Sequence, residues 1–137
     1  MYGSHFFVNN CPVPVEKIST CLNLDMLGRN SPESLYLVGS NLTHPQRVYF
    51  RSDHYPFIRF GIPSVWLFCG FTPDYHTPKD VLEYVDFQKF TKITKLTYLA
   101  AIEIGNRKGL LKLDVNREVT SRGKHNLEIR SLYEAKK

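Results

Sequence analysis

Residues 64–68 read Ser-Val-Trp-Leu-Phe, and this almost continuously apolar run decides the fold class. A strand that is buried on both faces of a sheet has this composition, because neither face meets water. Gly61-Ile-Pro63 precedes the run, and Cys69–Pro78 follows it as a loop dense in Gly, Pro, Asp and Thr. We therefore predict a central strand over residues 64–68, with a long polar loop at its carboxyl end.

Two further strands and a short helix are predicted before this central strand. Alternating side chains indicate a strand over Ile18–Leu24, and a second strand over Ser34–Val38 ends at Gly39. Asp53 is a suitable N-cap for a helix over His54–Phe60, because its carboxylate can accept from the free amides of the first turn.

A long helix is predicted to follow, over Phe87–Ile104. Asp86 is its expected N-cap, and its apolar residues recur at helical spacing. Its second half is apolar nearly all round, so we expect Tyr98–Ile102 to be deeply buried. The order strand, strand, helix, strand, helix predicts an α/β fold in which helices cover a sheet.

Charge is divided unevenly along the 137 residues, whose formal net charge is +5. Residues 1–106 hold nine basic and nine acidic side chains, whereas residues 107–137 hold nine basic and four acidic ones. We predict a globular part over residues 1–108 and a basic extension over residues 109–137. A basic tail is more often a solvated segment than a nucleic-acid-binding face, so no nucleic-acid partner is expected.

Neither a membrane partner nor a cysteine-based metal site is expected from the sequence. No apolar run approaches the length of a membrane span, and the first residues show no charged-then-apolar signal pattern. Cys11, Cys21 and Cys69 lack the spacing of a metal site. They are either buried thiols or one disulfide and a spare thiol, and both interpretations stay open.

Polar residues gather where the predicted strands end. Asp25 directly follows one strand, and His76 lies in the loop after another. In open α/β sheets, ligands bind beyond the carboxyl ends of the strands. A carboxylate and an imidazole that converge there would suit zinc. Taken singly, Asp25 could be a turn residue and His76 a surface residue, so these two positions alone do not name a reaction.

Four strings of sequence occur in order and are more specific than any single residue. They are Asn23-Leu-Asp-Met-Leu-Gly-Arg29, Arg51-Ser-Asp-His-Tyr-Pro-Phe57, Gly61-Ile-Pro63 and Asp74-Tyr-His-Thr-Pro-Lys-Asp80. Together they resemble the co-catalytic, di-zinc aminopeptidase family, which also contains glutaminyl cyclases and glutamate carboxypeptidase relatives. The resemblance covers about residues 3–107. It implies that residues 1–108 are the C-terminal half of a zinc-exopeptidase catalytic domain, part of a mixed, mostly parallel sheet flanked by helices.

The resemblance also implies roles for five residues. Asp25 and His76 would each bind one of two zinc ions. Asp53 and Asp80 would lie behind these ligands and fix their orientation, with Asp53 hydrogen-bonded to Asp25. Tyr75 would line the substrate pocket. The implied activity is release of N-terminal residues from peptide substrates, by enzymes that are usually secreted or periplasmic.

Two parts of the family's site have no counterpart in this sequence. The family has an upstream His-x-Asp, whose aspartate bridges the two metals, and a Glu-Glu pair that supplies the general base and another ligand. We find neither, so no catalytic residue is assigned here and the general base is expected upstream of residue 1. We expect the chain to be truncated, to bind zinc weakly or partially, to be inactive alone, and to associate with itself or with the missing N-terminal half.

Two other functions stay open at this point. In a glutaminyl cyclase relative, Asp25 would be a general acid/base and only His76 a metal ligand. In a catalytically dead relative, the domain would be kept for protein binding.

Overall fold

A computed structural model describes residues 1–39 and 48–112 of the chain. Its sheet has three strands, β1 (Cys21–Leu24), β2 (Tyr36–Val38) and β3 (Ser64–Phe68). The central strand is β3, which pairs in parallel with β1 and antiparallel with β2. The predicted central strand is thus confirmed with its bounds, in a small mixed sheet.

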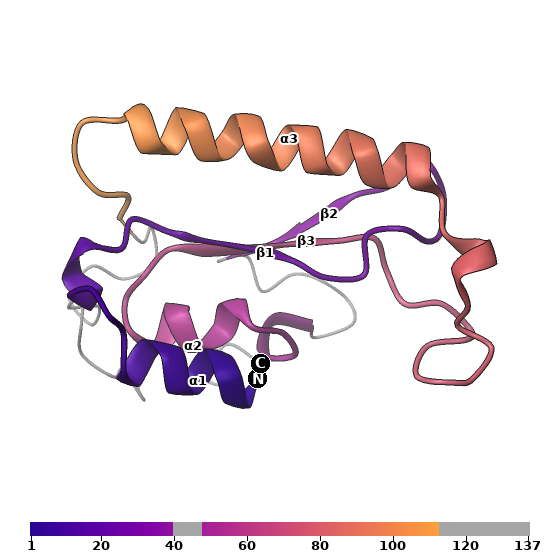
Figure 1. Ribbon diagram of the computed structural model, residues 1–137, viewed down its shortest axis with the longest axis horizontal. Coiled ribbons are helices and arrows are strands. Elements are labelled where there is room, and N and C mark those ends of the chain that lie inside the picture. The colour runs from indigo at the N-terminus through magenta and orange to yellow at the C-terminus, as the bar shows by residue number, and fades with distance from the viewer. Residues whose placement is uncertain (40–47, 113–137) are drawn as a thin grey trace, which may run out of the picture.

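Helices cover both faces of this sheet. They are α1 (Tyr2–Asn9), α2 (His54–Arg59) and α3 (Phe87–Asn106), with short 3-10 helices at Val15–Lys17, Val48–Phe50 and Leu82–Tyr84. Figure 1 shows α3 along one side of the sheet and α1 with α2 along the other. The predicted α/β class is confirmed in this form, whereas the larger exopeptidase fold stays a prediction.

Alternate side chains of β3 enter two different cores, as expected for a strand buried on both faces. Leu67 packs in a cluster with Ile93 of α3. Trp66 and Phe68 point the other way and pack with Val38 of β2. This alternation follows from the two-residue period of a strand. A five-residue run therefore supplies both layers of the core.

The outer strands are shorter than predicted. The first begins at Cys21, because residues 18–20 leave the sheet: Ile18 packs against the cluster of Val8, Phe60 and Ile62 between α1 and α2. The second begins at Tyr36, because Ser34 is held in a turn by a 3.1 Å hydrogen bond from its amide to the Ser31 carbonyl.

The long helix is confirmed, but its predicted burial is wrong. Asp86 caps α3 by accepting from the Lys89 amide at 2.9 Å. In the second half, however, Tyr98 is 65% exposed and Leu99 63%. A 20-residue helix is about 30 Å long, whereas a five-residue strand spans only about 17 Å. The sheet is therefore too short to cover the helix, and composition alone cannot reveal what a helix packs against.

Two further predictions concern the ends and the surroundings of the chain. Most of the predicted basic extension, residues 113–137, lies outside the described residues. Within the described ranges, no helix is long and apolar enough to cross a membrane.

Candidate active site

Asp25 begins the loop that follows β1, and it takes part in three hydrogen bonds, one of which is supported by a fourth. Its amide donates to the Leu67 carbonyl at 3.5 Å, and its own carbonyl accepts from the Trp66 indole at 3.0 Å. The Ser52 hydroxyl donates to Oδ2 of Asp25 at 2.8 Å, and the Asn23 amide group donates to that hydroxyl at 2.7 Å. Because Asn23 uses a lone pair of the Ser52 oxygen, the hydroxyl proton is left for Asp25. The carboxylate is therefore held in one orientation.

His76 lies in the loop that follows β3, on the same edge of the sheet. Strands β1 and β3 are parallel, with Leu24 opposite Leu67, so their carboxyl ends leave the sheet side by side. We call residues 25–31 the Asp25 loop and residues 74–80 the His76 turn. The juxtaposition of these two segments agrees with the rule for open α/β sheets. Direct convergence of Asp25 and His76 on one metal site stays a prediction.

The backbone of His76 has an unusual conformation. Its φ is +58°, in the left-handed region that residues other than glycine seldom adopt. The turn around it is closed by hydrogen bonds from the Thr77 amide and hydroxyl to the Asp74 carbonyl, at 2.9 and 2.8 Å. The Tyr75 ring stacks on the exposed imidazole, with centroids 3.9 Å apart. Tyr75 thus lies beside His76, where its predicted place in a substrate pocket stays untested.

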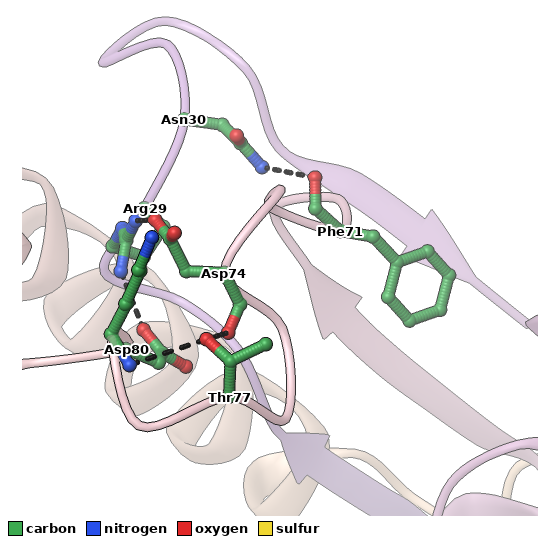
Figure 2. Close-up of polar contacts among 7 residues, drawn as sticks. Arg29, Asn30, Phe71, Asp74, Thr77 and Asp80 are labelled. Carbon is green, nitrogen blue, oxygen red and sulfur yellow. Dashed lines mark hydrogen bonds and ion pairs between the residues drawn. The ribbon is translucent and has the colours of Figure 1, made fainter.

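Arg29 joins the two segments, and sequence reasoning gave it no role. Its guanidinium donates to Asp80 at 2.5 Å and to Asp74 at 3.0 Å, as Figure 2 shows. The two carboxylates flank His76 in sequence. Asp80, predicted to support the ligands, therefore bonds to Arg29. The sequence offered only a weak indication of this link. Arg29 ends one string, and the two aspartates lie in another string, 45 and 51 residues away.

A second link between the two loops runs through Asn30. Its side-chain amide donates to the carbonyl of Cys69 at 2.8 Å and to that of Phe71 at 3.3 Å, and Figure 2 shows the second of these bonds. Gly70 lies between these acceptors with φ +95°, and a Cβ there would come within 3.1 Å of the Asn30 amide nitrogen. A glycine at position 70 thus permits both the turn and the close approach.

Asp53 contacts other groups than those the sequence predicted. Its side chain makes no capping hydrogen bond to α2. Instead, it accepts from the Ser4 hydroxyl at 2.5 Å and pairs with the Met1 amino group at 3.4 Å. The bond from Ser4 lowers the pKa of Asp53 below its usual range, and the Met1 charge adds to this. Asp25 receives its bond from the neighbouring Ser52, because Asp53 is turned toward α1.

The three cysteines are free thiols in the structure. Burial raises the pKa of the Cys21 thiol to about 11, and the nearby Asp53 carboxylate adds to the rise. The Cys69 thiol is buried and donates to the Leu27 carbonyl at 3.2 Å. The disulfide left open by the sequence is therefore not formed in the structure, and of the three thiols only that of Cys69 is fully buried.

The donor set of the described residues does not fit a complete zinc site. Zinc in proteins takes three or four protein ligands from His, Cys, Asp and Glu. Across residues 1–39 and 48–112, no three such side chains are grouped so that they could hold a metal ion. Asp25 and His76 could therefore contribute only part of a site.

Comparison with known proteins supports the resemblance over part of the chain. Residues 37–101 match the model of peptidase family M28. The matched segment contains the strings at 51–57, 61–63 and 74–80, whereas the string with Asp25 lies before it. No curated protein and no solved structure matches the chain. The family predicted from the ordered strings is thus supported over residues 37–101, which are similar to peptidase family M28, a family of metallopeptidases that hydrolyse peptide bonds and are generally zinc-dependent.

Proposed function

We propose that this chain is the C-terminal part of a zinc-dependent aminopeptidase, to which it contributes Asp25 and His76 as metal ligands. One observation carries the proposal. The segment after β1 and the segment after β3 leave the same edge of the sheet, and Arg29 ties them together through Asp74 and Asp80. A metal site that takes one ligand from each segment requires the two segments to lie side by side in this way.

The contacts of Asp25 support its proposed role. A carboxylate ligand works best when a hydrogen bond fixes its orientation, and such bonds are found behind most metal ligands. Ser52 supplies this bond, and Asn23 fixes the hydroxyl in turn. His76 is exposed, so its imidazole is accessible to a metal ion that is also bound by another segment.

We further propose that the chain has no peptidase activity alone. The described residues supply too few donors for a complete zinc site, and the sequence contains no counterpart of the family's general base. The missing ligands and the base would come from a segment that carries the family's His-x-Asp and Glu-Glu strings. The substrate would then be the N-terminal end of a peptide.

Reconstitution tests this proposal. The chain is mixed or co-expressed with an N-terminal segment of a family M28 enzyme that carries both strings, and hydrolysis of aminoacyl-nitroanilides is followed with and without a chelator. We expect chelator-sensitive hydrolysis from the mixture only, lost with Asp25→Ala or His76→Ala. Lys92→Ala, an exposed change on α3, is the control that retains activity. Activity that ignores both ligand changes would contradict the proposal.

The same assay separates the two alternatives. A glutaminyl cyclase relative would convert an N-terminal glutamine peptide to a cyclised product with loss of ammonia, and would release no amino acid. A protein-binding domain would give neither product and would take up no zinc in the mixture. Mass spectrometry of the products and a zinc count per complex therefore distinguish the three functions.

A further inference from the structure

We infer that Arg29 is a positioning residue, which sets the conformation of the His76 turn and is itself anchored by the buried Lys89. The structural part of this inference stands on contacts within the described chain. Its purpose, holding His76 ready as a ligand near Asp25, rests on the proposed function.

Arg29 is placed to act on both sides of His76 at once. Its two terminal nitrogens bond to carboxylates two residues before and four residues after the histidine. Its side chain is only 17% exposed, and its guanidinium also lies over the Tyr84 ring, 5.0 Å from the centroid. A planar, forked guanidinium can hold two carboxylates in fixed positions, which the single ammonium of a lysine cannot do.

Lys89 anchors the arginine from the opposite side. It lies on α3, is 2% exposed, and donates from Nζ to the carbonyls of Arg29 and Ser31, both at 2.7 Å. The two acceptors are backbone atoms of the Asp25 loop. A buried ammonium is costly unless it is hydrogen-bonded, and these two bonds fix the loop against the helix. The backbone at Arg29 is thus held while its side chain holds the His76 turn.

The backbone conformation of His76 gives an independent reason to expect a residue that holds the His76 turn in place. A left-handed φ at a residue with a side chain is unfavourable and persists where the surroundings impose it. Here the imposed turn runs from Asp74 to Asp80, the same two residues that Arg29 holds. An ordinary surface ion pair would contribute little to any conformation. Arg29, however, is partly buried and bonds to two carboxylates, so we expect it to contribute more to the conformation of the turn than a surface ion pair would.

Backbone amide exchange on the 137-residue chain, read residue by residue by NMR, tests this inference. The reporters are the Thr77 and Asp80 amides, which donate to the carbonyls of Asp74 and Thr77. In Arg29→Met we expect about tenfold faster exchange at both, because the turn loses its two charge-assisted bonds from the guanidinium. The Cys21 amide at the sheet, which donates to the Pro63 carbonyl, should exchange as before. The coupling constant that reports φ of His76 should also shift.

Further variants separate positioning from general stability. Arg29→Lys keeps the charge without the fork, so it should restore exchange protection only in part. Asp80→Asn removes one exposed partner, should fold, and should loosen the same two amides. Lys89→Met should loosen the Asp25 loop and the His76 turn together. Arg107→Met, an exposed arginine at the end of α3, is the matched control and should leave the turn unchanged.

Two outcomes would overturn the inference. One is unchanged exchange at Thr77 and Asp80 in both Arg29→Met and Asp80→Asn. The other is equal acceleration at the turn and at the sheet, which would make Arg29 a contributor to global stability only. Neither outcome bears on the proposed function, which instead fails if His76→Ala leaves the reconstituted activity intact.

Discussion

The hydroxyl of Ser52 donates a 2.8 Å hydrogen bond to Oδ2 of Asp25, across 27 residues of sequence. Ser52 is buried, at 3% exposure, and it also accepts from Asn23. The three side chains form a short chain of bonds that ends on the carboxylate proposed as a metal ligand. The orientation of Asp25 is therefore fixed by hydrogen bonds within the chain itself.

Ser52→Ala should weaken the reconstituted enzyme more than it weakens the fold. The change leaves the Asn23 amide and the Asp25 carboxylate without their partner. Loss of a group behind a ligand typically costs about 10–100-fold in metal affinity or activity. Zinc affinity and the rate of hydrolysis are the measurements. Ser64→Ala removes another buried hydroxyl, bonded to the Ile62 carbonyl at 3.0 Å, and should lower stability without this loss of activity.

Alanine substitutions at two glycines should have opposite effects on stability. A Cβ at Gly28 would lie 2.7 Å from Cγ1 of Val85, so Gly28→Ala should lower the free energy of unfolding by about 1–3 kcal/mol. Gly105 lies inside α3 and has open space around its Cβ position, so Gly105→Ala should raise it by about 0.5–1 kcal/mol. Denaturant unfolding of the two variants gives both values. If Gly28→Ala did not lower the free energy of unfolding, the Asp25 loop would be able to move away from Val85.

Cys21 should react slowly with alkylating reagents. Its pKa is raised from 9.0 to about 11, mainly by burial, and only the thiolate is the nucleophile. At pH 8 this shift of about two units leaves roughly 100-fold less thiolate than an ordinary cysteine has. Alkylation followed by mass spectrometry should therefore label Cys21 much more slowly in the folded chain than in the chain unfolded by urea.

The same shift gives a pH dependence of stability with a definite sign. The unfolded thiol ionises near pH 9 and the folded one near pH 11, so the unfolded state binds fewer protons between these values. The free energy of unfolding should therefore fall as the pH rises from about 9 to about 11. Cys21→Ala should remove this part of the slope, and an unchanged slope would show that other groups cause it.

The chain should associate with itself as its concentration rises. The second half of α3 exposes Leu96, Tyr98, Leu99 and Ile102. Exposed apolar surface and unpaired strand edges both favour contact with other chains. Light scattering after size exclusion should show the association, and Leu99→Glu should reduce it. A monodisperse monomer that melts cooperatively above about 60 °C would contradict this expectation.

The sequence predicted the local features well. The run at 64–68 is apolar, short and bounded by Gly and Pro residues. Its length and its conformation as a strand could therefore both be predicted from the local sequence. The Asp86 cap was also predictable, because a cap depends on residues within one helical turn. The starts of β1 and β2 were predicted too early, because the end of a strand depends on where its partner β3 stops pairing.

The contacts between distant segments could not be predicted in this way. The bond from Ser52 to Asp25 spans 27 residues, and that from Arg29 to Asp80 spans 51. Adjacent residues such as Ser52 and Asp53 look equally able to approach Asp25 until the start of α2 turns one of them away. The burial of α3 was mispredicted for a related reason, because its partners were inferred from composition.

Anomalous diffraction at the zinc edge, from crystals of the reconstituted two-part protein, tests the central claim most directly. The account predicts two zinc peaks about 3.5–4 Å apart. One should lie about 2.0–2.2 Å from a carboxylate oxygen of Asp25, and the other about 2.0–2.1 Å from an imidazole nitrogen of His76. Zinc peaks that touch neither side chain, in a complex with zinc-dependent peptidase activity, would contradict the claim that this chain supplies two of the metal ligands.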